Sequence, residues 1–386
     1  MNPQDIAIIG AGPAGLAFAR AMQGSGRKIT LIERQPRAAL ADPAFDGREI
    51  ALTQRSIATL KSLGAWDLFP ADDVWPLRAA KVLNGASPMA LTFEPEGGAA
   101  GELGALVANH HIRKALYQLA DGADDVTLLT DVVGASAQRT DTGFRIGLGD
   151  DEAIEAKLLV VADSRFSTFR DQLGVGADMN RLGRAMLVCR MTHDADHGHV
   201  ATEWFDHGQT LAILPLGPGC SSIVVTLAAP EIDKLMAMDE AAFEAEMTRR
   251  HKGRLGALKL VSTRHAYPLV TTWSHRFAGP GFALIGDAAV GMHPVTAHGF
   301  NLGLLSAVGL ARRLRAGRDL AALNVLSAYE SEHRRAALPL YTATNAIARL
   351  YATETAPAKL ARHALLRLGR QAHPVRRLIS RALTAA

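Results

Sequence analysis

Three glycines near the N-terminus have the spacing of a phosphate-binding turn. They lie in the segment Gly10-Ala-Gly-Pro-Ala-Gly15, which follows an apolar run at Asp5–Ile9 and precedes the segment Leu16–Met22. The run predicts a buried parallel strand and the segment after the glycines predicts a helix. A second strand is predicted at Lys28–Ile32, and Glu33 follows it directly. This order of strand, glycines, helix, strand and acid indicates a dinucleotide site.

Each of these residues has a physical reason to be there. Gly10 permits the tight turn, Gly12 lets the backbone approach a pyrophosphate, and Gly15 lets the helix lie close to the strand. The freed N–H groups at the start of the helix face the anion. Glu33 is expected to accept hydrogen bonds from an adenosine ribose, and its charge disfavours NADP, which carries a 2′-phosphate. The segment alone leaves both NAD and FAD open.

A second segment, far along the chain, favours a flavin. Gly281–Ile285 predicts another buried strand, and Asp287 follows it in position to hold ribityl hydroxyls. Gly299–Gly303 predicts a loop in front of a helix that runs from Leu304 to about Leu314. N–H dipoles at a helix start would stabilise the negative charge that the pyrimidine end of a flavin gains on reduction. An NAD dehydrogenase has no need of this segment, so we expect FAD.

Together the two segments resemble the class A flavoprotein monooxygenases of the p-hydroxybenzoate hydroxylase fold, and within them the ubiquinone-biosynthesis hydroxylases of the UbiH/UbiM type. The resemblance covers most of the chain to about residue 335. Two positions depart from the usual family pattern, Ser164 after Asp163 and His298 before Gly299, and the UbiM-like subgroup shares both. The narrower match is carried by residues 46–56, 60–66, 107–109, 162–167, 286–289 and 293–301.

The resemblance implies roles for individual residues. Arg48 should lie near the flavin, Asn109 or Arg113 near the FAD phosphates, and Asp163 should serve both FAD and the transient visit of NAD(P)H. Pro294 and His298 should flank the reaction face with Arg48; His298 is either a proton relay or holds the loop by a backbone hydrogen bond. The full expected cofactor site is Gly10, Gly12, Pro13, Ala14, Gly15, Glu33, Arg34, Arg48, Asn109, Arg113, Asp163, Gly286, Asp287, Pro294, Gly299, Phe300 and Asn301.

The predicted fold is α/β, with a Rossmann-like FAD-binding domain formed by residues 1–75, 102–172 and 274–316. Residues 76–101 and 173–273 are expected to form an interleaved substrate domain, and residues 317–386 a helical C-terminus. Strand patterns at 184–191, 209–214 and 221–227, with turns at Gly208 and Gly217–Gly219, predict an antiparallel sheet over the flavin. A charged helix is expected at Glu240–Arg250. The substrate would lie between the sheet and the flavin.

The reaction that the resemblance implies is hydroxylation of an electron-rich phenolic ring. NAD(P)H would reduce FAD, O₂ would form a flavin hydroperoxide, and the ring of a (poly)prenylated phenol in ubiquinone biosynthesis would take up the oxygen. No sequence feature identifies a base for the phenol. Three alternatives stay open: a hydroxylase of a small soluble phenol or natural product, a flavin reductase of the geranylgeranyl type, and a non-enzymatic flavin-bearing accessory protein.

Composition excludes several other classes. The formal net charge of +4 on 386 residues gives no reason to expect a nucleic-acid partner. Cys189 and Cys220 form neither a disulfide framework nor a metal cluster, and the spacing in His193–His199 fits no common metal site, so we expect no metal. We see no secretory signal and no run of about 18 apolar residues. A cytoplasmic location is expected.

The C-terminal tail has its own charge pattern. After Glu354 it has no acids but seven basic residues, with leucines at roughly helical spacing among them. A basic amphipathic helix is typical of a segment that contacts a membrane surface or a partner protein. An ordinary solvated helix packed on the core explains the pattern equally well. The basic residues are Lys359, Arg362, Arg367, Arg370, Arg376, Arg377 and Arg381.

Overall fold

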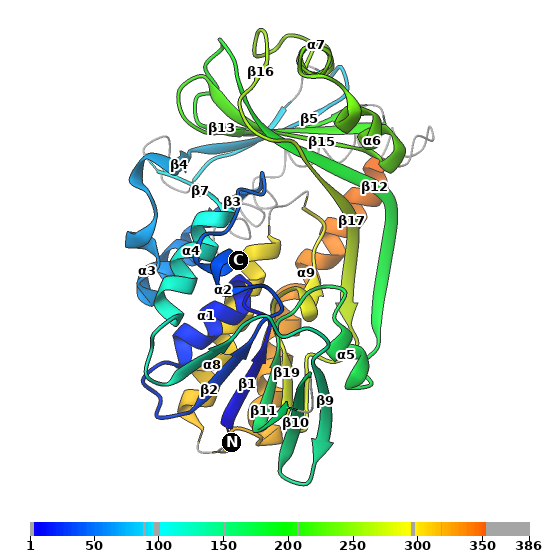
Figure 1. The fold of residues 1–386 in the computed structure, drawn as a ribbon. Coiled ribbons are helices and arrows are strands. Elements are labelled where there is room, and N and C mark those ends of the chain that lie inside the picture. The colour runs from blue at the N-terminus through cyan, green and yellow to red at the C-terminus, as the bar shows by residue number, and fades with distance from the viewer. Residues whose placement is uncertain are drawn as a thin grey trace.

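The structure, a computed structural model, describes residues 4–87, 90–95, 101–149, 152–206, 208–294, 298–317 and 319–352. The described residues form one half around a parallel sheet and another around an antiparallel sheet, and two long strands connect the halves (Figure 1). The predicted α/β fold with two kinds of sheet is therefore confirmed.

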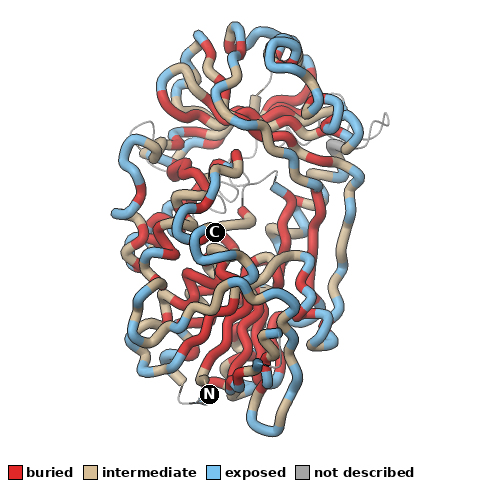
Figure 2. Tube along the Cα trace, viewed as in Figure 1, coloured by how far each residue is buried: buried red, intermediate tan, exposed pale blue. Residues whose placement is uncertain are grey.

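The parallel sheet, here called the base sheet, has the strand order β18-β19-β11-β1-β2-β8. Its central strands are apolar because helices and other elements cover both of their faces: Ile6, Ala7 and Ile8 are fully buried (Figure 2). A β9–β10 hairpin adds antiparallel strands to β11. The bounds are β1 Gln4–Ile9, β2 Ile29–Ile32, β8 Val126–Leu129, β9 Ser136–Thr140, β10 Gly143–Gly149, β11 Glu152–Val161, β18 Ala278–Gly279 and β19 Phe282–Leu284.

Helices of this half bring distant parts of the chain together. Helix α1 (Pro13–Met22) packs against both α4 (Asn109–Ala120) and α8 (Gly299–Ala316), and α8 packs against the long α9 (Leu323–Ala352). Helices α1 and α8, which begin in the two glycine segments of the sequence, thus lie side by side. The remaining helices are α2 Arg37–Ala41, α3 Gln54–Leu63, α5 Thr168–Gln172, α6 Ala229–Ala237, α7 Glu240–Arg250, η1 Trp66–Leu68, η2 Ala71–Asp73 and η3 Gly286–Ala288.

The second sheet, here called the roof sheet, has the order β20-β17-β12-β15-β14-β13-β5-β6. Helices α6 and α7 cover its outer face with a second apolar core, and its inner face looks toward the base sheet (Figure 1). Its bounds are β5 Ala79–Asn84, β6 Ala90–Phe93, β12 Ala177–Thr192, β13 Val200–Asp206, β14 Gln209–Pro215, β15 Cys220–Ala228, β17 His265–Ser274 and β20 Val290–Gly291, with β16 Lys259–Leu260 pairing beside β12.

A three-stranded sheet of β3 (Glu49–Thr53), β7 (Gly104–Ala108) and β4 (Val74–Leu77) lies between the two larger sheets (Figure 1). Strand β7 is buried along its whole length and pairs antiparallel with both neighbours. This sheet positions the segment around Arg48, because β3 begins directly after that residue.

Two local predictions differ from the structure. Helix α8 begins at Gly299, so the expected loop Gly299–Gly303 is its first turn, and the prediction of a start at Leu304 is wrong. Glycines disfavour helix, but packing of this turn on neighbouring backbone outweighs that preference. Strand β13 was not expected, because Glu203 interrupts the apolar residues on its inner face.

Other expectations fall outside what the structure tests. Residues 353–386, and with them the basic tail, lie outside the described residues. Within the described part of the chain, no helix is both long and apolar enough to cross a membrane. The division into FAD-binding, substrate and C-terminal segments stays a prediction.

Candidate active site

The first glycine motif is required by packing as well as by its turn. Gly10 has φ +101°, and a Cβ there would lie 2.7 Å from the Ala162 carbonyl oxygen. A Cβ on Gly15 would lie 2.0 Å from the Gly10 carbonyl oxygen. Gly12 differs, because a Cβ there would meet no described atom within 4 Å. Gly10 and Gly15 therefore shape the turn, while Gly12 leaves open space in front of it.

That open space lies at an anion-binding helix end. Gly12 is the N-cap of α1, its own position offers no capping side chain, and Pro13 begins the helix. The uncapped N–H groups of the first turn favour a negatively charged group. Beside them, the Oδ1 atom of Asp163 is buried and has no hydrogen-bond partner among the described residues, and burial raises the pKa of this carboxyl. Both features fit a nucleotide cofactor.

Glu33 is held at the carboxyl end of β2. Its Oε2 accepts a hydrogen bond from the Ala11 N–H at 2.7 Å, and its Oε1 accepts one from the Gln35 N–H at 2.9 Å. Arg113 donates from Nη2 to the Gln35 side-chain oxygen at 3.2 Å. The carboxylate is thus fixed where a ribose would meet it, and Arg113 and Arg34 stand beside it in the same cavity.

The second motif interlocks with the first. Gly286 has φ +59°, and a Cβ there would lie 2.8 Å from the Ala14 Cβ. A Cβ on Gly303 would lie 3.4 Å from the Gly286 Cα. The next residue, Asp287, forms an ion pair with Arg165, whose Nη2 lies 2.6 Å from Oδ2. The two motifs therefore form one continuous surface.

Asn301 ties the start of α8 to β3. Its Oδ1 accepts a hydrogen bond from the Thr53 N–H at 3.1 Å, and its Nδ2 donates to the Ala51 carbonyl at 2.9 Å. The side-chain amide therefore mimics a neighbouring strand. Its predicted cofactor contact stays a prediction, and with the amide bonded to β3 this contact would come from its backbone. His298, the N-cap of α8, is buried beside it.

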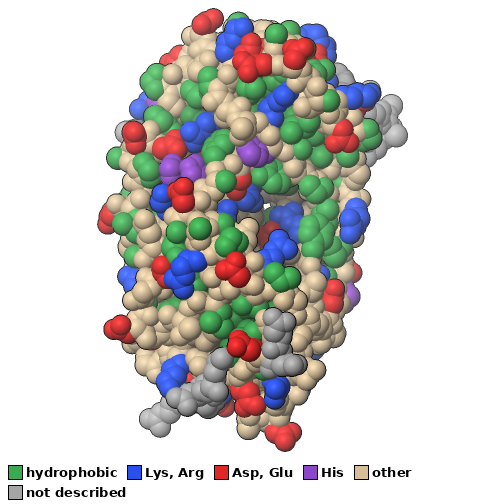
Figure 3. Space-filling view, in the orientation of Figure 1, with side chains coloured by type: hydrophobic (Ala, Val, Ile, Leu, Met, Phe, Trp, Pro, Cys, Tyr) green, Lys and Arg blue, Asp and Glu red, His purple; other side chains and the backbone are tan. Residues whose placement is uncertain are grey.

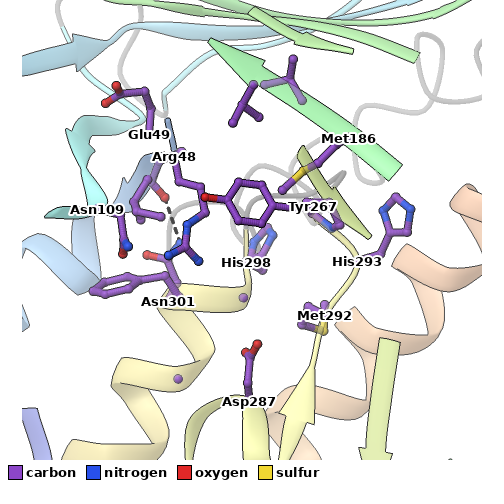
Figure 4. Close-up of a pocket in the computed structure, with 18 of the residues that line it drawn as sticks. Arg48, Glu49, Asn109, Met186, Tyr267, Asp287, Met292, His293, His298 and Asn301 are labelled. Atoms are coloured by element: carbon purple, nitrogen blue, oxygen red, sulfur yellow. Dashed lines mark hydrogen bonds between the residues drawn. The ribbon is translucent and has the colours of Figure 1, made fainter. Parts of the chain in front are cut away.

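Arg48, which directly precedes β3, also lines this cavity (Figure 4). Its Nη2 lies 2.6 Å from the Asp46 carboxylate, and its guanidinium stands 5.4 Å from the centre of the Tyr267 ring. Asn109 donates from Nδ2 to the same Asp46 carboxylate at 2.7 Å, and the Tyr267 hydroxyl donates to the Asp46 carbonyl at 2.7 Å. Asp46 thus positions three residues. Tyr267 was not predicted and has no local sequence signal.

A second charged group borders the cavity above Arg48. The Glu49 carboxylate lies 2.7 Å from Arg190, which also contacts Asp73 at 3.1 Å, and Asp73 accepts a contact from His111 at 2.8 Å. Burial raises the pKa of Glu49 to about 7 although Arg190 opposes this shift. Glu49 therefore has a cationic partner, Arg190, which it shares with Asp73.

One cavity of about 1340 Å³ lies between the base sheet and the roof sheet, and it is lined by Arg48, Glu49, Asp163, Tyr267 and Asp287 among others. This exceeds the roughly 300–1,000 Å³ of a site for one small ligand, so a cofactor and a substrate both have room. A hollow with Lys or Arg side chains at its edge is visible on the surface in Figure 3. Every predicted site residue except Gly10 and Gly15 lines it, and those two stand behind its wall.

His293 is a lining residue that the motif contained but that was not assigned a role. Burial, with Arg184 and Arg165 nearby, lowers the pKa of its imidazole to about 4, so the ring is neutral at pH 7. Figure 4 shows Met292 and His298 below Tyr267 and Met186 of the roof sheet, and His293 to the side of them. The predicted roles of Pro294 and His298 on the reaction face stay predictions; both residues line the cavity.

Comparison with known proteins agrees with this geometry. A family described as an FAD binding domain matches residues 4–344. The ubiquinone hydroxylase UbiM of Neisseria meningitidis is 45% identical over 98% of this chain and 84% of its own length. The ubiquinone hydroxylase UbiL of Rhodospirillum rubrum is 32% identical over 98% of this chain and 88% of its own length.

A solved structure shows the same fold at low identity. The p-nitrophenol 4-monooxygenase of Pseudomonas putida superimposes with a TM-score of 0.75 at 18% identity, covering 99% of this chain and 97% of its own. The expected resemblance is confirmed by both kinds of comparison. With a family match over nearly its whole length and close relatives of one type, the chain belongs to the FAD-dependent monooxygenases, in the family of the ubiquinone hydroxylases.

Proposed function

We propose that this enzyme hydroxylates the aromatic ring of a polyprenylated phenol in ubiquinone biosynthesis, with NAD(P)H and O₂ as co-substrates. The observation that supports this most strongly is the single cavity that joins both flavin motifs to the inner face of the roof sheet. The pathway is proposed because the relatives UbiM and UbiL are named ubiquinone hydroxylases. When bound, FAD supplies the transfer of oxygen from O₂ to the ring.

The residues of this chain have distinct tasks in such a reaction. The uncapped start of α1, Glu33 and Asp163 would hold the nucleotide end of FAD, and the start of α8 would face its flavin end. The inner face of the roof sheet is mainly apolar, so it excludes water from the ring and from the reacting atoms. The neutral His293 adds no charge to this region. The large cavity suits a substrate with an apolar chain.

The main rival is hydroxylation of a small phenol. It is favoured by the fold likeness to p-nitrophenol 4-monooxygenase, although that likeness is a matter of fold alone. Purified, FAD-loaded protein distinguishes the two: we expect a prenylated phenol to accelerate NAD(P)H oxidation and to be recovered with one added oxygen, and p-nitrophenol to do neither. The reverse result would establish the rival. Turnover that continues without O₂ would indicate a reductase instead.

We also propose that the enzyme works at a membrane surface, since a polyprenylated substrate resides there. The support is the sequence of the tail, which has seven basic residues and no acid after Glu354. A protein shortened after residue 352 should lose sedimentation with vesicles that contain anionic lipid, while keeping turnover of a short-chain phenol in solution. Equal sedimentation of both proteins would contradict this role of the tail.

A further inference from the structure

One acid stands alone on the inner face of the roof sheet. Glu203 lies in the middle of β13, where it pairs with Ala212 of β14 on one side and with Val82 of β5 on the other. Its neighbour Trp204 faces the opposite way, into the core beneath α6 and α7. Glu203 therefore points into the cavity, which it lines.

The row of side chains that crosses the sheet at this level is otherwise apolar. Following the strand pairing, the row is Leu91, Val82, Glu203, Ala212, Val224 and Val188, and all of these residues line the cavity. The residues two positions away along β13, Ala201 and Phe205, line it as well. Glu203 is half-buried in this wall, and its carboxyl group has apolar neighbours in place of a protein hydrogen-bond partner.

No described residue pairs with this carboxyl. The charged residues that line the cavity on neighbouring elements are Lys81 of β5, Arg184 of β12 and Arg349 of α9. None of them forms a hydrogen bond or an ion pair with Glu203, and burial is the single influence on its pKa, which it raises to about 8. Glu49, the other acid with a strongly raised pKa at this cavity, is instead paired with Arg190. Glu203 is thus available to a ligand.

We propose that Glu203 is the residue that recognises a ring oxygen of the aromatic substrate by a direct hydrogen bond. This inference rests on the proposed function, because it takes the substrate to be a phenol. The neutral acid donates its proton to a ring oxygen, and its carbonyl oxygen accepts a hydrogen bond from a ring hydroxyl. No covalent bond is made or broken. An unmatched buried polar group penalises a ring that lacks the oxygen, so Glu203 sets specificity.

The test compares two probes on the FAD-loaded protein, 2-prenylphenol and prenylbenzene, which differ by the ring hydroxyl alone. Binding is followed by the change in flavin absorbance, without turnover. We expect the wild type to bind the phenol about tenfold more tightly. Glu203→Leu should reduce this preference to about twofold or less, chiefly by weaker binding of the phenol. Glu203→Gln, which keeps a donor and an acceptor, should retain most of it.

A matched control makes the same Glu→Gln change elsewhere. Glu155→Gln changes an exposed residue of β11 in the base sheet and should leave the preference unchanged. A Glu203→Leu protein with the full wild-type preference would overturn the inference, as would a wild type that hydroxylates the phenol without preferring it over prenylbenzene. If the wild type neither binds nor hydroxylates the prenylphenol, the proposed function fails first, and this inference fails with it. Should the Leu variant not fold, Glu203→Ala, which removes the carboxyl group without adding bulk, takes its place in the same comparison.

Discussion

In the base half of the molecule the residues that border the cavity come in short contiguous runs, whereas in the roof sheet they come singly from alternate positions of separate strands. Gly10–Gly15 and Gly286–Gly303 are each local, and a Cβ at Gly10, Gly15 or Gly286 would lie less than 3 Å from a neighbouring atom. Glu203 and its apolar row come from six different strands. Cofactor sites built on backbone leave a sequence pattern, and substrate sites built on side chains across a sheet do not.

The largest effect on stability should come from adding a methyl group to the glycine turn after β1 of the base sheet. Gly15→Ala places a Cβ 2.0 Å from the Gly10 carbonyl oxygen, so backbone must move, and we expect a loss of about 3 kcal/mol or more in the free energy of unfolding. Gly12→Ala has no such contact and should unfold like the wild type without FAD, yet bind FAD more weakly. Chemical denaturation and FAD titration measure the two properties. Equal stability of the two variants would contradict the packing argument.

A smaller effect is expected where the base meets the small β3 sheet. Asn301→Ala leaves the Thr53 N–H and the Ala51 carbonyl without their partner, which should cost about 2 kcal/mol and weaken FAD binding by misplacing α8. Urea unfolding of the FAD-loaded and FAD-free proteins separates these two effects. If FAD affinity falls without loss of stability, the amide contacts the cofactor directly and its bonds to β3 are secondary.

The smallest effect is the pH dependence of stability that Glu203 of the roof sheet should cause. Because burial raises the pKa of Glu203 from its ordinary 4.5 to about 8, the folded state keeps a proton that the unfolded chain loses between these two pH values. Rising pH through this window therefore destabilises the wild type. Glu203→Gln lacks this loss, so its Tm relative to the wild type should increase by about 1–3 °C between pH 5 and pH 9. A constant difference would show that the carboxyl is solvated.

Which features of the site could be predicted from the sequence depends on whether the contacting residues are near or far apart along the chain. Asp46 appeared in a matched segment, but its hydrogen bond with Asn109 spans 63 residues, so its link between Asn109 and Arg48 becomes visible only in the folded chain. Helix α8 starts earlier than propensity indicates, because Asn301 binds β3 across 248 residues of sequence. Local signals could not foresee either contact, since both partners are brought together by the packing of separate sheets.

By itself, the sequence determined that this protein binds FAD, because the first glycine segment indicates a dinucleotide and the second segment, with Asp287 and Gly299–Gly303, indicates a flavin. Both segments are local, and a glycine that a tight turn requires leaves the same spacing wherever it occurs. It also determined the family through these and other short segments. Only the tertiary structure decided which acid faces the substrate. Glu203 has no motif around it, and its significance arises from strand pairing that surrounds one carboxyl group with apolar side chains in the cavity.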